Sequence, residues 1–194
     1  MRFEYAEGAT PLSPETMDGL IPNLTTQGEL NEFEARNIAL AQRWALRARG
    51  DNRDMLLATT LKTLHAKMFD QTWRWAGQFR RVETNIGVAW IHIPQRVEQL
   101  CGNTQYQVEH AVWPWDELAV RFHHELVSIH PFPNGNGRHA RLATDLLRIR
   151  NGQSRFTWGS TSLIENSLVR QEYIAALREA DRGDYERLLQ FVRT

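Results

Sequence analysis

The stretch that decides the fold and chemistry of this chain is a run of nine residues with an arginine three positions after it: His130-Pro131-Phe132-Pro133-Asn134-Gly135-Asn136-Gly137-Arg138, then Arg141. Glycines let the backbone turn tightly and expose successive N–H groups, and a helix N-terminus adds a dipole that favours anions. Two arginines one helical turn apart supply forked donors for further phosphate oxygens. The run therefore predicts an imidazole base beside a polyphosphate-binding turn that opens a helix.

Length and charge narrow the class of protein. The chain has 194 residues, which suits one domain with a sizeable core, and it carries 23 basic and 23 acidic side chains. That balance gives no positive field for nucleic acid or a membrane surface. A single cysteine, Cys101, excludes an internal disulfide framework. Because we find neither an apolar signal segment nor a membrane-length apolar run, we expect a cytoplasmic protein that binds neither nucleic acid nor membrane.

Hydrophobic periodicity predicts a mainly all-α chain. We expect an irregular N-terminal arm over residues 1–24 and one globular domain over 25–194. The last two predicted helices cover residues 163–180 and 184–193, and the earlier ones cover 29–47, 54–68, 94–108, 116–129 and 136–150. Proline disfavours α geometry in the residue before it, so Pro131 should end the preceding helix at His130. The imidazole would then lie at the edge between helix and loop.

One segment departs from the helical pattern. Residues 79–93 are rich in β-branched and aromatic side chains, and Asn85-Ile86-Gly87 at their middle has turn chemistry. The pattern predicts a small β-hairpin that projects from the helical body. Such a hairpin is either a surface excursion without a role or an edge that docks another chain by β-augmentation.

The long motif resembles that of a known family. His130-Pro-Phe-x-x-Gly-Asn-Gly-Arg138-x-x-Arg141 is similar to the Fic (Fic/Doc) motif, His-x-Phe-x-Asp/Glu-Gly-Asn-Gly-Arg-x-x-Arg. Residues 75–80 resemble the family's approach to its flap hairpin, and residues 28–34 resemble the subgroup called mobile mystery protein B. The resemblance covers most of residues 25–194. It implies the Fic fold, a helical bundle with a small β-hairpin flap.

The resemblance also implies an activity, which is transfer of AMP from ATP to a Tyr, Ser or Thr hydroxyl of a target protein. His130 would be the general base, and Phe132 a buried anchor. The nucleotide-binding residues would be Gly135, Asn136, Gly137, Arg138 and Arg141. The first three would surround the α- and β-phosphates, the first arginine would neutralise the β-phosphate, and the second would hold the γ-phosphate.

One motif position differs from the family pattern. Asn134 stands where the family has an Asp or Glu that helps to hold Mg²⁺. An amide carbonyl lacks a negative charge and is a weaker ligand for a hard cation, so we expect Mg²⁺ to be held weakly. This difference leaves open a domain that binds nucleotide or a partner without turnover. A second alternative is the Doc-like branch, which phosphorylates its target. That branch has a lysine where this chain has Gly137, and the glycine at this position favours AMP transfer.

The resemblance further implies protein partners. The flap would dock the target through Val82, Asn85, Ile86, Gly87 and Val88. Many family members are restrained by a glutamate in the pattern Ser/Thr-x-x-x-Glu-Gly/Asn. Thr161-x-x-x-Glu165-Asn166 matches this pattern, but it lies at the start of a predicted core helix, so a chance match is favoured. Thr25-x-x-x-Glu29 is followed by Leu30, which breaks the pattern, and a helix cap explains Glu29. If neither restrains the protein, a small antitoxin partner would supply the glutamate, as in toxin–antitoxin members.

Two other interpretations of the motif region are disfavoured. The glycine spacing of Gly135-x-Gly137-x-x-Ala140 also fits a dinucleotide-binding fingerprint, but that site needs a strand before it, whereas residues 116–129 are predicted to be helical. The histidines at positions 123, 124, 130 and 139 suggest a metal cluster. Adjacent histidines on a helix point in different directions, so packing roles are favoured.

Overall fold

The structure is a computed structural model that describes residues 13–49, 54–159 and 168–194. Within these ranges the regular structure is helical, as predicted, with one isolated antiparallel bridge between Leu20 and Trp73. The elements are α1 (Pro14–Met17), α2 (Gln27–Arg47), α3 (Ala58–Phe69), the 3₁₀ turn η2 (Trp90–His92), α4 (Ile93–Glu109), α5 (Trp115–Ile129), α6 (Asn136–Arg150), α7 (Leu168–Ala180) and α8 (Glu186–Phe191).

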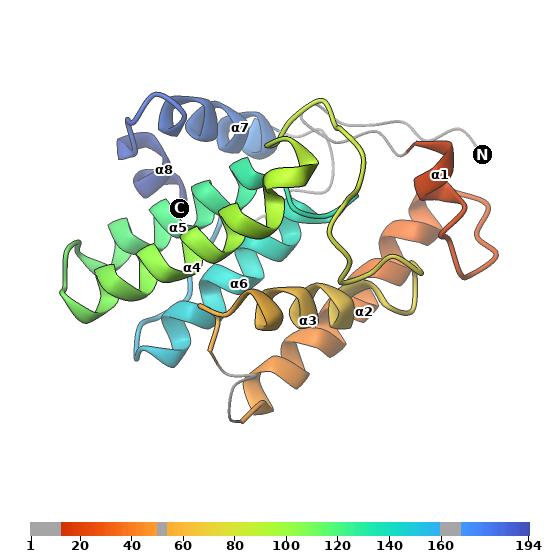
Figure 1. The fold of residues 1–194 in the computed structure, drawn as a ribbon, viewed down its shortest axis with the longest axis horizontal. Coiled ribbons are helices and arrows are strands. Elements are labelled where there is room, and N and C mark those ends of the chain that lie inside the picture. Colours follow the sequence, from red (N-terminus) through yellow and green to blue (C-terminus); the bar gives the residue numbers. More distant parts are fainter. Residues whose placement is uncertain (1–12, 50–53, 160–167) are drawn as a thin grey trace.

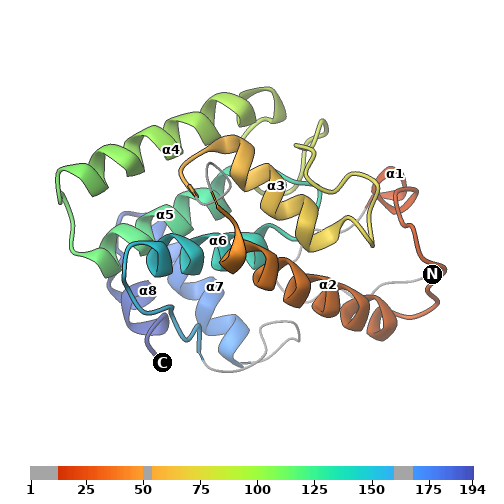
Figure 2. The same ribbon diagram turned by 90° about the horizontal axis from the view of Figure 1, so that it is seen from below.

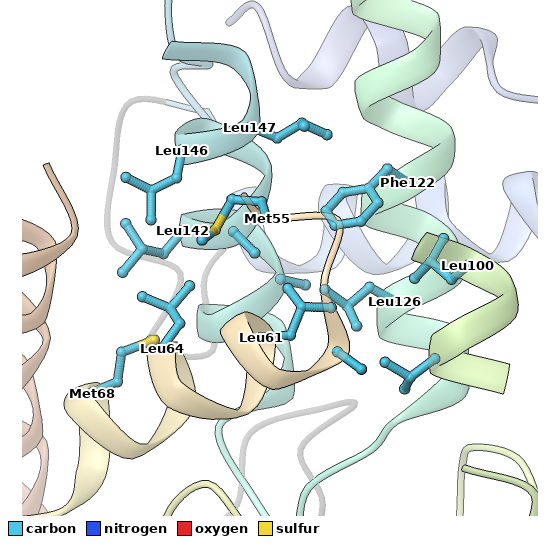
Figure 3. Close-up of a cluster of buried hydrophobic side chains, with 14 of the residues drawn as sticks. Met55, Leu61, Leu64, Met68, Leu100, Phe122, Leu126, Leu142, Leu146 and Leu147 are labelled. Carbon is cyan, nitrogen blue, oxygen red and sulfur yellow. The ribbon is translucent and has the colours of Figure 1, made fainter. Parts of the chain in front are cut away.

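Helix α6 is the central element of the fold. It packs against α5 on one side and against α3 and α2 on the other, while α4 covers α5 (Figures 1 and 2). Figure 3 shows the main core, in which side chains from α3, α5 and α6 meet; these include Leu61, Leu64, Phe122, Leu126, Leu142 and Leu146. A second cluster joins α5 to α7 and α8. Helix α6 is therefore packed between α5 on one side and α3 and α2 on the other.

Local sequence signals explain some of the helix boundaries. Thr26 and Glu29 form the predicted capping box, in which the Glu29 N–H donates to the Thr26 hydroxyl at 3.2 Å and the Thr26 N–H donates to the Glu29 carboxylate at 3.0 Å. The motif helix spans residues 136–150 as predicted. Asp116 lies in the first turn of α5 and does not cap it, because its carboxylate pairs with Arg148 at 2.9 Å and Arg193 at 2.6 Å.

The predicted β-hairpin is wrong. Residues 79–89 contain no strand, and we call residues 81–89 the 81–89 loop. The carbonyl groups of Val82 and Val88, which a hairpin would pair across its strands, accept hydrogen bonds from the Arg80 guanidinium. The Val88 N–H donates to the Ile129 carbonyl at 3.3 Å. Because a buried side chain and a neighbouring turn satisfy this backbone, no cross-strand ladder forms.

Residues 13–24, the described part of the predicted arm, lie against the body. Pro14–Met17 form one helical turn, and the Ser13 hydroxyl caps it. Two backbone bonds join this segment to the chain after α3, from the Ile21 N–H to Thr72 and from the Arg74 N–H to Gly19, each 2.9 Å long. None of the described helices is both long enough and apolar enough to cross a membrane.

Candidate active site

The motif turn, residues 130–138, is built on unusual backbone geometry. Helix α5 ends at Ile129, as Pro131 predicts, and His130 takes a left-handed conformation with φ 54° and ψ 60°. Gly135 has φ 78°, and a Cβ there would lie 2.6 Å from the Phe69 ring. Helix α6 therefore begins at a position where only glycine fits without strain.

Asn136 closes the motif turn through its buried side chain. The Phe132 N–H donates to its Oδ1 at 2.9 Å, and its Nδ2 donates to the Phe132 carbonyl at 2.8 Å. The Phe132 side chain is fully buried, as expected of an anchor. The first N–H groups of α6 have no partner within the helix, so the closed turn leaves a helix N-terminus of the kind that binds anions.

The His130 ring lies beneath the surface and is neutral. The residue is 6% exposed, and burial, with a smaller contribution from the Arg80 cation, lowers the pKa of His130 to about 4. At neutral pH the ring therefore carries no charge and is able to accept a proton. A nearby negative charge would raise the pKa again and strengthen the ring as a base.

Arg138 is held by a buried carboxylate that sequence reasoning missed. Its Nη1 donates to Glu34 of α2 at 2.6 Å, and Glu34 also accepts from the Trp73 indole N–H at 2.7 Å. The Arg138 Nη2 donates to the Asn134 side-chain oxygen at 3.3 Å. A signal was available, because Glu34 lies four residues after Leu30 on the buried face of α2.

Arg141 lies one turn further along α6. One of its guanidinium nitrogens is 3.7 Å from the position that a Cβ on Gly137 would take. The guanidinium carbon is 5.6 Å from the centroid of the Tyr173 ring. Burial lowers the pKa of Arg141, and the Arg138 cation contributes in the same direction. The structure thus brings both motif arginines to the start of α6.

His65 of α3 is a second residue that sequence reasoning missed. Its Nδ1 accepts from the Gly77 N–H at 2.9 Å, so its Nε2 carries the proton and donates to the Asn134 carbonyl at 3.1 Å. The ring stacks on Phe132, with centroids 3.7 Å apart. Burial holds the pKa of His65 well below its usual value. This neutral histidine fixes the backbone of the motif turn from α3.

The 81–89 loop lies directly against the base. Gly87 has φ 105°, and a Cβ there would lie 2.6 Å from the Cβ of His130. Val82, Asn85 and Ile86 are exposed, whereas Val88 is partly buried. The apolar side chains of Trp90 and Ile91 are exposed just beyond the loop. Of the residues predicted to dock a target, Gly87 therefore lies against His130, and the five form no hairpin.

The two candidate restraining glutamates have different outcomes. The Glu29 carboxylate accepts from the N–H groups of Thr25 at 2.7 Å and Thr26 at 3.0 Å, and these bonds lower the pKa of Glu29. Glu29 therefore acts as a cap, and Glu34 is the α2 glutamate that reaches a motif arginine. Glu165 lies outside the described residues.

The alternatives disfavoured from sequence are also disfavoured by the structure. Helix α5 precedes the motif turn. The dinucleotide-binding alternative requires a strand at this place, so the structure disfavours it. Three of the clustered histidines bind separate partners: His123 contacts the Tyr173 hydroxyl, His124 contacts Asp181, and His139 contacts the Leu61 carbonyl. In the part of the chain that the structure describes, no group of three or more His, Cys, Asp or Glu side chains is arranged to hold a metal ion.

Comparison with known proteins identifies the domain. Residues 56–147 match the Fic/DOC family. The chain carries a Fic/DOC domain. It is 26% identical over 179 residues to a probable protein adenylyltransferase, y4lH, of Sinorhizobium fredii, an alignment that covers 88% of this chain and 86% of that protein. It is 32% identical over 120 residues to protein adenylyltransferase fic-1 of Caenorhabditis briggsae, which covers 60% of this chain but 22% of that protein. The matched part of this chain thus spans 22% of the length of the Caenorhabditis briggsae relative.

Solved structures show the same fold. Fic-1 of Caenorhabditis elegans has a TM-score of 0.66 at 23% identity, over 89% of this chain and 50% of that one. BepC of Bartonella tribocorum, solved with bound AMPPNP, has a TM-score of 0.68 at 18% identity, over 93% of this chain and 96% of that one. The helical part of the expected Fic fold is therefore confirmed.

Proposed function

We propose that this Fic domain transfers AMP from ATP to the hydroxyl group of a Tyr, Ser or Thr side chain in a target protein. The observation that carries the proposal is the neutral His130 beside a helix N-terminus with two arginines. Relatives named as protein adenylyltransferases support the activity, and the AMPPNP bound to BepC supports a nucleotide at a site of this kind.

In the proposed reaction the target oxygen attacks the α-phosphorus of ATP. The bond from that phosphorus to the α,β-bridging oxygen breaks, pyrophosphate leaves, and His130 takes the hydroxyl proton. General base catalysis of this type contributes roughly 10²–10⁴ in rate. Gly135, Gly137 and the other N–H groups at the start of α6 bind the phosphates, and Arg138 and Arg141 offset the charge that develops on the leaving group.

Asn134 does not suit an Mg²⁺ ion held by the protein. The Asn134 carbonyl accepts from His65, and its side-chain oxygen accepts from Arg138, so both oxygens face hydrogen-bond donors. No step of the proposed reaction therefore uses an Mg²⁺ ion held by this chain. We expect Asn134→Asp to lower the Mg²⁺ concentration needed for half-maximal binding of AMPPNP, with Asn85→Asp as the control. Identical Mg²⁺ titrations for wild type and Asn134→Asp would contradict this expectation.

The target is proposed to dock on the 81–89 loop. The support is the contact of Gly87 with His130 and the exposed apolar side chains of Val82 and Ile86 beside it. An extended target segment lying on the loop would bring its hydroxyl to the base. A small antitoxin partner is a further proposal, and its support is that Glu29 is committed to a helix cap.

One experiment tests the activity. The protein is incubated with cell lysate and ATP labelled at the α- or the γ-phosphate, with His130→Ala as the inactive variant and the exposed His110→Ala as its matched control. Label from the α-phosphate alone, lost in His130→Ala and kept in His110→Ala, is the expected result. Label from the γ-phosphate alone supports a Doc-like phosphotransferase. Absence of His130-dependent label supports a nucleotide-binding domain without turnover, the alternative that Asn134 favours.

A further inference from the structure

Arg80 is a buried arginine whose partners are backbone carbonyl groups. The residue is 2% exposed. Its guanidinium donates to four carbonyls: His130 at 2.7 Å, Val82 at 2.9 Å, Ile129 at 3.5 Å, and Val88. Its ion pair with Glu83 is 3.8 Å long, and the Glu83 side chain is 65% exposed. The arginine is thus desolvated mainly to bind main-chain dipoles, and this burial lowers its pKa.

These four carbonyls belong to two separate segments. Val82 and Val88 lie at the two ends of the 81–89 loop, whereas Ile129 and His130 lie at the end of α5. The backbone adds two further links between the same segments, from the Arg80 N–H to the Pro131 carbonyl at 2.9 Å and from the Val88 N–H to Ile129 at 3.3 Å. One side chain therefore closes the loop on itself and joins it to the residue that carries the imidazole.

We infer that Arg80 is a positioning residue that fixes the 81–89 loop against His130, so that a protein substrate on the loop meets the base in a productive geometry. This inference rests on the proposed function for its catalytic consequence. The bonds that Arg80 makes to the motif turn go to His130 and Pro131, at the opposite end of the turn from Arg138. Its loss should therefore affect protein modification much more than nucleotide binding.

The size of the expected effect follows from the geometry. Without Arg80 the loop ends separate, and the His130 carbonyl loses its 2.7 Å bond. A displacement of about 1 Å between reacting groups costs on the order of a hundredfold in rate. Arg80→Met removes every side-chain hydrogen bond but keeps an unbranched apolar stem. Arg80→Lys keeps the charge and part of the hydrogen bonding, so an intermediate loss is expected. Arg74→Met, at an exposed arginine that lies outside the loop and the motif turn, is the matched control.

The experiment uses three measurements on each full-length variant: the Kd for AMPPNP by calorimetry, His130-dependent labelling of lysate proteins from α-labelled ATP, and amide hydrogen exchange at Val88. For Arg80→Met we expect labelling to fall about a hundredfold. The exchange rate at Val88 should rise by at least about tenfold, because the loop opens locally. The Kd for AMPPNP should stay within about threefold, a change of under 1 kcal/mol. Arg74→Met should match the wild type in all three.

Three results would overturn the inference. The first is wild-type labelling and wild-type Val88 exchange in Arg80→Met. The second is an equal loss of AMPPNP binding and labelling, which would show a general role in folding. The third result applies if Arg80→Met does not fold, and it is full labelling by a folded Arg80→Lys protein. Failure of the proposed function is distinguishable, since the wild type would then show no His130-dependent label while the exchange at Val88 still tests the Arg80 contacts.

Discussion

The motif turn and the 81–89 loop touch each other at His130 and Gly87, yet they are built in opposite ways. The motif turn is held by buried side chains from three helices: His65 of α3, Glu34 of α2, and its own Asn136 at the start of α6. The loop exposes most of its side chains and is held chiefly by Arg80. A rigid turn suits the binding of phosphates, and an exposed loop suits contact with a second protein.

The largest expected difference between the two regions is their response to acid. Burial lowers the pKa of His130 and His139 to about 4 and that of His65 well below its usual value. These histidines bind protons in the unfolded chain near pH 6.5 but not in the folded protein, so stability is complete above pH 6.5 and is lost as the pH falls toward 4. Each contributes up to about 1.4 kcal/mol per pH unit in that window.

Urea denaturation between pH 7.5 and pH 5 measures this effect, and hydrogen exchange at pH 5 locates it. Exchange should rise first in the motif turn, since the 81–89 loop contains no histidine. His65→Gln should reduce the slope of stability against pH, whereas His110→Gln, at an exposed position, should not. A stability that does not change between pH 7 and pH 5 would show that folding does not lower the pKa of the buried histidines.

The next largest difference concerns the carboxylate beside each arginine. Glu34→Ala removes the partner of Arg138 and of the Trp73 indole, and should lower the free energy of unfolding by about 3–5 kcal/mol. Glu83→Ala removes a mostly exposed carboxylate near Arg80 and should cost about 0–1 kcal/mol. Urea midpoints compare the two variants. Equal losses would mean that the buried pair contributes no more than the exposed one.

Two asparagines give a smaller and more direct contrast. Asn136→Ala leaves the buried N–H and carbonyl of Phe132 without their partner, which should cost roughly 2–4 kcal/mol. Asn85→Ala changes an exposed side chain in the 81–89 loop and should stay within about 0.5 kcal/mol of the wild type. Thermal unfolding of both proteins in one buffer is sufficient. A similar shift in both would mean that the loop is as tightly held as the motif turn.

The same contrast explains what the sequence could predict. The start of α2 and the end of α5 at Ile129 were accessible because they depend on neighbours along the chain, namely the capping box of Thr26 and Glu29 and the effect of Pro131. The contacts that hold the site were not, because they join residues far apart in sequence. The bond from Arg80 to His130 spans 50 positions, that from His65 to Asn134 spans 69, and that from Arg138 to Glu34 spans 104.

The hairpin was predicted wrongly for the same reason. β-Branched and aromatic residues around Asn85-Ile86-Gly87 do favour strands, but propensity is a weak determinant where a distant group satisfies the backbone. Arg80 supplies that group, and no local pattern distinguishes it from its neighbour Arg81, which is exposed. Apolar side chains in the segment, which would form one face of a hairpin, are instead left partly exposed beside His130.

The smallest expected effect on stability is also the most informative about that exposed surface. Ile86 is 42% exposed, and Ile86→Ser should change the free energy of unfolding by no more than about 0.5 kcal/mol. The same change at Ile149, 38% exposed near the end of α6, is the matched control. If the loop docks the target, Ile86→Ser should reduce His130-dependent labelling severalfold by raising the KM for the protein substrate, and Ile149→Ser should leave labelling unchanged. Equal labelling by both variants would remove Ile86 from the docking surface. A large loss of stability in Ile86→Ser would contradict the contrast itself, because the loop would then belong to the rigid part of the site.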